Sequence, residues 1–190
     1  MTDPITPRVA AELTGHEDIV LEAYLDSAKP PVWTWSIGIT KASGVDPLQY
    51  KDKPAPLGVC LAAYVGLLRK AYAPAVLKAF KGRALTEAQF AAALSFHYST
   101  GAIASTSWVA LWLSGNIAAA RAFLTSHYLN GGTLAERRAK EAALFFDGNW
   151  AGDGTAMVIP VSKPSYQPAF SKGKRVAITG ALAAALGVSA

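Results

Sequence analysis

Residues that bind metals or undergo redox chemistry are scarce in this chain of 190 residues, which contains one cysteine and three histidines. A single cysteine cannot form an internal disulfide, and no CxxC pair exists for a structural zinc site. His16, His97 and His127 are far apart in the sequence and none belongs to an HExxH motif, so we expect no metal site. The motifs GxSxG and GxGxxG and the P-loop are absent too, which argues against an elbow-type serine hydrolase and against nucleotide binding.

The sequence also has no apolar run that is long enough for a membrane-spanning helix, and none at its N-terminus. The uncharged stretches 54–68 and 176–190 are shorter than the roughly 18–20 apolar residues that a membrane-spanning helix needs. Residues 1–8 carry Asp3 and have no apolar run, unlike a signal peptide. We therefore expect no integral membrane span and a chain that is made in a cytoplasm.

Charged residues make up only 16% of the chain and are unevenly distributed. Residues 1–55 contain five basic and eight acidic residues, whereas residues 56–190 contain thirteen and five. The net charge of +5 favours an acidic partner, such as nucleic acid, an anionic envelope or an acidic substrate. Because no recognisable nucleic-acid-binding module is present, nucleic acid is not expected among the partners.

Alanine is abundant, with 37 residues, and favours helices. The apolar share of 52% excludes a disordered chain. Residues 19–40 alternate apolar and polar side chains, which predicts short strands with a turn at Lys29-Pro30-Pro31. Helices are predicted over residues 7–16, 57–80 (kinked at Pro74), 86–100, 105–114, 116–128, 133–147 and 176–188.

These elements predict an α+β, mainly helical fold in a single domain. A small β-containing lobe with the N-terminal helix covers residues 1–56, a connecting helix covers 57–80, and a larger helical lobe covers 81–150. Residues 151–190 form a C-terminal extension. Because residues 148–175 contain Gly, Pro and Ser and show little periodicity, we expect them to wrap over the surface.

Residues 16–40 carry the clearest chemical signal. Glu17 and Asp26 are nine residues apart, and the stretch Trp33-Thr34-Trp35-Ser36 follows them. Glycoside hydrolysis uses such a pair: one carboxylic acid protonates the leaving oxygen, and the other carboxylate stabilises oxocarbenium charge or activates water. The acid must stay protonated near neutral pH, which requires a desolvated site. The spacing alone also fits two ordinary exposed acids at the ends of elements.

Three segments in order, within roughly residues 10–150, resemble the phage-type lysozymes of glycoside hydrolase family 24. The family carries a Glu, a Tyr-x-Asp and a Thr-x-Gly-x-Gly-x-Thr strand; the same order here reads Glu17, Tyr24-Leu25-Asp26 and Thr34-Trp35-Ser36-Ile37-Gly38-Ile39-Thr40. Residues 93–107 (ALSFHYSTGAIASTS) and 134–145 (LAERRAKEAALF) are similar to two later helical segments of the family. The resemblance implies a lysozyme-like, two-lobed fold.

The resemblance also implies three roles. Glu17 would be the general acid, Asp26 the second carboxylate, and Thr34 a residue that helps to hold the attacking water. The sequence departs from the family at Ser36, where the first glycine of the strand is expected, and at Ile39, where a histidine is expected. A rival register aligns Ser36 rather than Thr34 with the family threonine.

Two further acids compete for the catalytic roles. Asp18 is a competitor for Glu17 and Glu22 is a competitor for Asp26. Asp18 is interpreted as solvent-facing, because the family often has glycine at that position.

The substrate-binding candidates lie on the predicted strand and on a predicted helix. Trp33 and Trp35 are next-nearest neighbours on a strand and share one face, where they either stack on sugars or belong to the core. Ser36 is a further candidate on that strand, and Tyr98 and Ser99 would line the cleft from the helical lobe.

Three other features are expected to be structural. Trp108 and Trp112 are four residues apart on a helix, which is the spacing of core positions. We expect the helix that begins near Arg137-Arg138 to be solvated over one face and to have one buried ion pair. Cys60 lies in an apolar stretch, where we expect it to be buried.

The resemblance implies a monomeric endolysin muramidase that acts on the glycan strands of peptidoglycan, without a cofactor, for host lysis. It would wait in the host cytoplasm until a membrane lesion releases it. The acidic first 55 residues contain both carboxylates, and the basic remainder would hold an anionic wall. Three alternatives stay open: a catalytically inactive peptidoglycan-binding or particle-structural protein on the same fold, a nucleic-acid-binding protein, and a lytic transglycosylase.

Overall fold

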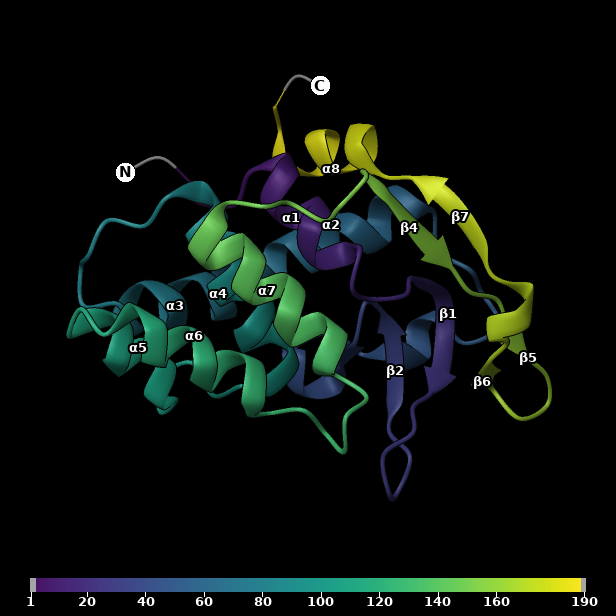
Figure 1. Cartoon of the computed structure of the whole chain (residues 1–190). Coiled ribbons are helices and arrows are strands. Elements are labelled where there is room, and N and C mark those ends of the chain that lie inside the picture. The colour runs from purple at the N-terminus through teal and green to yellow at the C-terminus, as the bar shows by residue number, and fades with distance from the viewer. Residues whose placement is uncertain (1–2, 189–190) are drawn as a thin grey trace. The chain divides into compact units, whose positions relative to one another are not determined.

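A computed structural model describes residues 3–188 of the chain (Figure 1). The chain divides into two compact units. The first, which we call the β unit, is discontinuous and contains residues 6–67 and 153–188; the second, the helical unit, contains residues 3–5 and 68–152. The predicted fold class, α+β and mainly helical, is confirmed.

The β unit contains all the strands among the described residues, in three small antiparallel sheets. The first is a meander of β1, β2 and β3, the second pairs β4 with β7, and the third pairs β5 with β6. Three α-helices and three short 3-10 helices (Lys41–Ser43, Pro47–Tyr50 and Phe170–Lys172) accompany these sheets in the described residues. The elements of this unit are α1 (Pro7–Thr14), β1 (Val20–Leu25), β2 (Trp33–Ser36), β3 (Ile39–Thr40), α2 (Leu57–Leu67), β4 (Thr155–Val158), β5 (Val161–Ser162), β6 (Gln167–Pro168), β7 (Lys174–Ala177) and α8 (Thr179–Leu186).

The β1–β2 hairpin agrees with the predicted strands and their turn. Tyr24 lies opposite Thr34, and Leu25 lies opposite Trp33. The pairing is irregular between Val20 and Tyr24. The turn over Lys29-Pro30-Pro31 is therefore at the tip of this hairpin, as expected from the two prolines.

The C-terminal segment is mostly exposed or half-buried, as expected of a segment that wraps over the surface, but it also contains strands that the sequence analysis did not predict. The N–H of Ile19 donates to the carbonyl oxygen of Met157, and the N–H of Ile159 donates to the carbonyl oxygen of Ile19, each at 2.8 Å. Figure 1 shows β4 and β7 running beside the N-terminal part of the β unit. Strands of two to four residues are too short to show an alternating pattern, and the contacts of Ile19 with Met157 and Ile159 join residues that are far apart in the sequence.

The predicted kink at Pro74 coincides with a change of helix type. α2 passes into a π-helical turn over Leu68–Tyr72, and α3 (Ala73–Ala79) follows. Proline has no N–H for the helical hydrogen bond and its ring crowds the preceding turn, which accounts for the irregular turn just before it. Among residues 3–188, Leu57–Ala79 is the one helix whose length and composition would allow a membrane span, a test that helices in protein cores also pass.

The helical unit is built around aromatic side chains. It contains α3, α4 (Glu87–Thr100), α5 (Ser107–Leu113), α6 (Ile117–Ser126) and α7 (Ala135–Asp147). Trp108 is fully buried, with its ring centroid 5.6 Å from that of Phe96 and 5.0 Å from that of Phe145 in edge-to-face geometry. Trp112 is half-buried against Phe145. The expected core role is confirmed for Trp108 and holds in part for Trp112.

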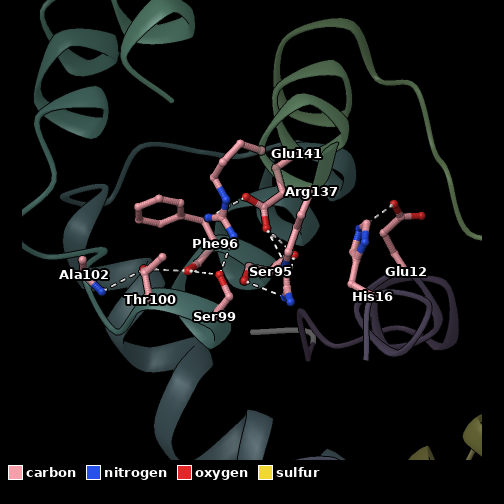
Figure 2. A network of polar contacts seen from close by, with 10 residues as sticks. Glu12, His16, Ser95, Phe96, Ser99, Thr100, Ala102, Arg137 and Glu141 are labelled. Carbon is pink, nitrogen blue, oxygen red and sulfur yellow. Dashed lines mark hydrogen bonds and ion pairs between the residues drawn. The ribbon is translucent and has the colours of Figure 1, made fainter. Parts of the chain in front are cut away.

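A buried polar cluster joins α4 to α7 (Figure 2). Glu141 is 1% exposed; its Oε2 lies 2.8 Å from Nη1 of Arg138, and its Oε1 accepts hydrogen bonds from Ser95 Oγ at 2.6 Å and Arg137 Nε at 3.1 Å. Arg138 is fully buried as well. The expected buried ion pair on this helix is thus present, and it is part of a larger network.

Candidate active site

The carboxylate of Asp26 accepts hydrogen bonds from the loop that connects β1 to β2. Its Oδ1 accepts hydrogen bonds from the backbone N–H groups of Ala28, at 3.0 Å, and Val32, at 2.8 Å. The hydroxyl of Thr34 lies 3.4 Å from Oδ2 and 3.1 Å from the carbonyl oxygen of Val32. Asp26 is therefore held in one orientation, with one oxygen on the backbone and the other facing Thr34.

Glu17 lies on the short turn that joins α1 to β1. α1 begins at Pro7, directly after the N-cap residue Thr6. The hydroxyl of Thr6 accepts a hydrogen bond from the N–H of Val9 at 3.1 Å. After α1 ends, the N–H of Glu17 donates to the carbonyl oxygen of Thr14 at 3.1 Å. The backbone of Glu17 is thus tied to the last turn of a capped helix, and its side chain is half-buried.

Glu17 and Asp26 line one cavity of about 260 Å³. The chain thus brings together the two acids that the sequence singled out. The lining mixes acidic, aromatic, apolar and amide side chains, and some of it comes from the C-terminal segment. The lining residues are Glu17, Asp18, Val20, Tyr24, Leu25, Asp26, Ser27, Gly38, Gln167, Pro168 and Phe170.

A larger cavity of the β unit has a different character. It measures about 620 Å³, and most of its walls are aliphatic side chains and prolines. The acid in its lining, Glu22, is ion-paired with Lys163, since Oε2 and Nζ are 2.8 Å apart. Glu22 therefore does not replace Asp26 beside Glu17, and we take the smaller cavity as the candidate active site.

Tyr24 reports on the charge of the candidate site. Burial is the main cause that raises the pKa of its phenol far above the ordinary value, and the negative charges of Asp26, Glu17 and Asp18 raise it further. Three carboxylates thus act on one phenol, which stays protonated across the physiological range. Asp18 is exposed, as expected, but it also lines the cavity, and partial burial raises the pKa of its carboxyl group.

The structure contradicts a substrate contact by Trp35. Its side chain is 0% exposed, its ring is stacked on that of Tyr50 with the centroids 3.7 Å apart, and its Nε1 donates to the carbonyl oxygen of Leu21 at 3.0 Å. Successive strand residues point to opposite faces, so the orientation of Thr34 toward Asp26 turns Trp35 the other way. Trp35 is a core residue.

Ser36 is also buried rather than open to substrate. It is 0% exposed, and its Oγ donates to the carbonyl oxygen of Cys60 at 3.1 Å. The rival register assigns the role of the family threonine to Ser36, but the hydroxyl that lies beside Asp26 is that of Thr34. Cys60 is buried as expected, and burial raises the pKa of its thiol to about 11.

Trp33 lies outside the cavity lining. Its ring meets that of Tyr166 edge to face, with the centroids 5.2 Å apart, and Nζ of Lys51 lies 5.4 Å from its centroid. The half-buried ring therefore packs against the C-terminal segment, which leaves less of it for stacking on a sugar.

Tyr98 and Ser99 belong to the helical unit, on α4. The ring centroid of Tyr98 is 4.8 Å from that of Tyr72. The hydroxyl of Ser99 accepts a hydrogen bond from Nη2 of Arg138 and lies 3.4 Å from the carbonyl oxygen of Phe96. Ser99 thus takes part in the network of Figure 2, and the substrate-binding role of both residues stays a prediction.

Sequence reasoning missed the contribution of the C-terminal segment to the cavity. Gln167, Pro168 and Phe170 have no motif around them. The segment is tied to β1 by a hydrogen bond across more than 140 residues, from the N–H of Leu25 to the carbonyl oxygen of Tyr166, which no local pattern predicts. Within residues 3–188, no group of three or more His, Cys, Asp or Glu side chains is arranged to hold a metal ion.

Comparisons with known proteins bear on the fold and the family of the chain. A search of curated proteins finds no match. Among solved structures, the muramidase domain of SpmX from Asticaccaulis excentricus matches with a TM-score of 0.53 and 20% identity, over 77% of this chain and 99% of that chain, which shows a shared fold. The family model of phage lysozymes matches residues 14–141, a span that includes Glu17, Asp26 and Thr34, and the chain therefore belongs to the phage lysozyme family.

Proposed function

We propose that the protein is a muramidase that hydrolyses the β-1,4 bond between N-acetylmuramic acid and N-acetylglucosamine in peptidoglycan. The observation that carries the proposal is the pairing of Glu17 and Asp26 in one cavity, with the hydroxyl of Thr34 beside Asp26. Membership of the phage lysozyme family supports a glycoside hydrolase of muramidase type.

In this proposal the two carboxyl groups divide the chemistry. Glu17 donates its proton to the leaving glycosidic oxygen, and Asp26 stays ionised to stabilise the oxocarbenium charge or to activate water. Two backbone N–H groups hold Oδ1 of Asp26 and leave Oδ2 for this task. The protonated phenol of Tyr24 is available as a hydrogen-bond donor at the cavity wall. No step requires a cofactor.

The departures from the family strand weigh little against activity. Ser36 is buried with its hydroxyl on Cys60, and Ile39 is 1% exposed, so both substituted side chains belong to the core. Neither lines the cavity, whereas Gly38, which matches the family glycine, does. The inactive peptidoglycan-binding alternative therefore loses its sequence support.

Product analysis tests the reaction. Purified protein is incubated with purified peptidoglycan, and the soluble fragments are analysed by mass spectrometry. We expect fragments that end in a reducing N-acetylmuramic acid, with the mass of one added water per cleavage. Anhydro-sugar ends would indicate a transglycosylase instead, and wall binding without fragments would indicate the inactive alternative.

We expect Thr34 to act by orienting Asp26, since its hydroxyl is beside Oδ2 and only 3% of the residue is exposed. Thr34→Ala should lower kcat on peptidoglycan by about tenfold, as expected for loss of a long hydrogen bond to a charged group, worth about 1.5 kcal/mol. Thr34→Ser keeps the hydroxyl and should retain most of the activity. Equal activity of the alanine variant and the wild type would contradict the role.

The biological setting is part of the proposal. We infer a monomeric endolysin that acts on the glycan strands of the host wall, stored in the host cytoplasm until a membrane lesion opens. The basic character of residues 56–190 supports adhesion to an anionic wall.

A further inference from the structure

The candidate active site has a wall that lies outside the family match. The phage lysozyme model ends at residue 141, whereas Gln167, Pro168 and Phe170 line the cavity that contains Glu17 and Asp26. The segment that matches the family therefore supplies both carboxylates, and a segment outside the family match supplies part of the surface that a substrate would meet. We call residues 167–170 the C-terminal wall.

The C-terminal wall is fixed to the β unit by its backbone at both ends. The N–H of Leu25 donates to the carbonyl oxygen of Tyr166, and the N–H of Ala169 donates to the carbonyl oxygen of Pro160, each at 2.8 Å. The first bond ties the wall directly to the residue before Asp26. The wall is thus held in place beside the reacting groups before any substrate arrives.

Side chains on the approach to the wall add to this attachment. Lys163 forms ion pairs with Glu22, at 2.8 Å, and with Asp52, whose carboxylate also accepts from the hydroxyl of Tyr166. The ring of Tyr166 packs edge to face on Trp33. Trp33, a candidate for sugar stacking in the sequence, therefore supports the loop that carries the wall.

Phe170 is the most exposed large apolar side chain among the described residues, with 66% of its surface open to solvent. An aromatic ring held open at the rim of a cavity gains by covering an apolar surface of a ligand. One face of a pyranose ring presents C–H groups and offers such a surface. The exposed amide of Gln167 adds a donor and an acceptor, which suit hydroxyl and N-acetyl groups.

We propose that the C-terminal wall is a sugar-binding site for the glycan strand: Phe170 stacks on a pyranose ring beside the scissile bond, and Gln167 hydrogen-bonds to its substituents. This inference rests on the proposed muramidase function and extends it, because it assigns substrate affinity to residues beyond the family segment. The wall affects binding more than chemistry, since it contains no acid or base.

Kinetics on peptide-free glycan strands test the wall. Phe170→Ala should raise KM about tenfold with a smaller change in kcat, as loss of one aromatic contact of about 1.5 kcal/mol predicts. Phe170→Trp should restore the wild-type KM. Leu48→Ala, which truncates another exposed apolar side chain outside the cavity lining, should change neither constant. The thermal midpoint of Phe170→Ala should stay unchanged, because the side chain is exposed.

A binding measurement separates this inference from the proposed function. In a Glu17→Gln background the glycan strands are not cleaved, and Phe170→Ala should weaken their binding about tenfold by calorimetry. If Phe170→Ala weakens glycan binding but the wild-type protein does not hydrolyse peptidoglycan, the muramidase function is overturned and the sugar-binding role of the C-terminal wall is retained. If the wild-type protein is active and Phe170→Ala changes neither KM nor affinity, the sugar-binding role of the C-terminal wall is overturned. An effect on intact peptidoglycan alone would assign it to the stem peptide and overturn the sugar contact.

Discussion

Glu17→Gln is expected to lower the rate of peptidoglycan hydrolysis by about 10²–10⁴-fold, the usual contribution of a general acid. The amide fills nearly the same space as the carboxylic acid but has no proton to give to the leaving oxygen. Release of reducing ends from purified peptidoglycan measures the effect. Since Glu17 lies on a surface turn behind α1, the variant should fold normally, which the near-UV circular dichroism spectrum would check.

Two further variants make this result specific. Asp18→Asn removes the neighbouring acid of the same cavity, and we expect a much smaller loss because Asp18 is exposed. Glu136→Gln removes an exposed acid that pairs with Lys140 in the helical unit, and it should leave the rate unchanged. A loss with Asp18→Asn as large as with Glu17→Gln would move the general acid to Asp18.

Glu141→Ala is expected to lower the free energy of unfolding by about 3–5 kcal/mol, the cost of leaving a buried charge without its partner. Arg138 is fully buried and would lose the carboxylate 2.8 Å from its Nη1, while Ser95 would lose the acceptor for its hydroxyl. Urea unfolding followed by tryptophan fluorescence measures the change.

The matched control is an ion pair on the same helix. Glu136 and Lys140 are separated by 2.6 Å, and their side chains are 81% and 44% exposed. Because exposed pairs contribute about 0–1 kcal/mol, Glu136→Ala should have a small effect. If Glu141→Ala were no more destabilising than Glu136→Ala, the buried cluster of Figure 2 would not stabilise the fold.

Local sequence signals were sufficient for most helices and for the hairpin. α4 shows why: Thr86 caps it, with Thr86 Oγ1 accepting from the N–H of Gln89 and the Gln89 side chain accepting from the N–H of Thr86. Lys29-Pro30-Pro31 marks the hairpin tip in the same way. Such signals act between residues a few positions apart, so they can be read from the sequence.

The part of the candidate site that comes from one continuous stretch of sequence could be predicted, and the part that comes from a distant segment could not. Glu17, Asp26 and Thr34 belong to one continuous stretch, and the structure brings the two acids into one cavity. The alternation of side chains along the strand predicted that Trp33 and Trp35 share one face, but it did not show that this face is directed away from Asp26. Phe170 belongs to a segment that is tied to β1 by the hydrogen bond between Leu25 and Tyr166, a contact between distant parts of the sequence for which there is no local signal.

The discontinuity of the β unit has a consequence for how the protein is made on the ribosome. Both acids are translated within the first 26 residues, but the unit that holds them also needs residues 153–188, the last that the structure describes. Residues 68–152, which make up nearly all of the helical unit, are synthesised in between and can fold first. The cavity thus reaches its final form only after residue 170 has been added, so for most of translation the nascent chain carries the two candidate catalytic acids without the complete cavity around them.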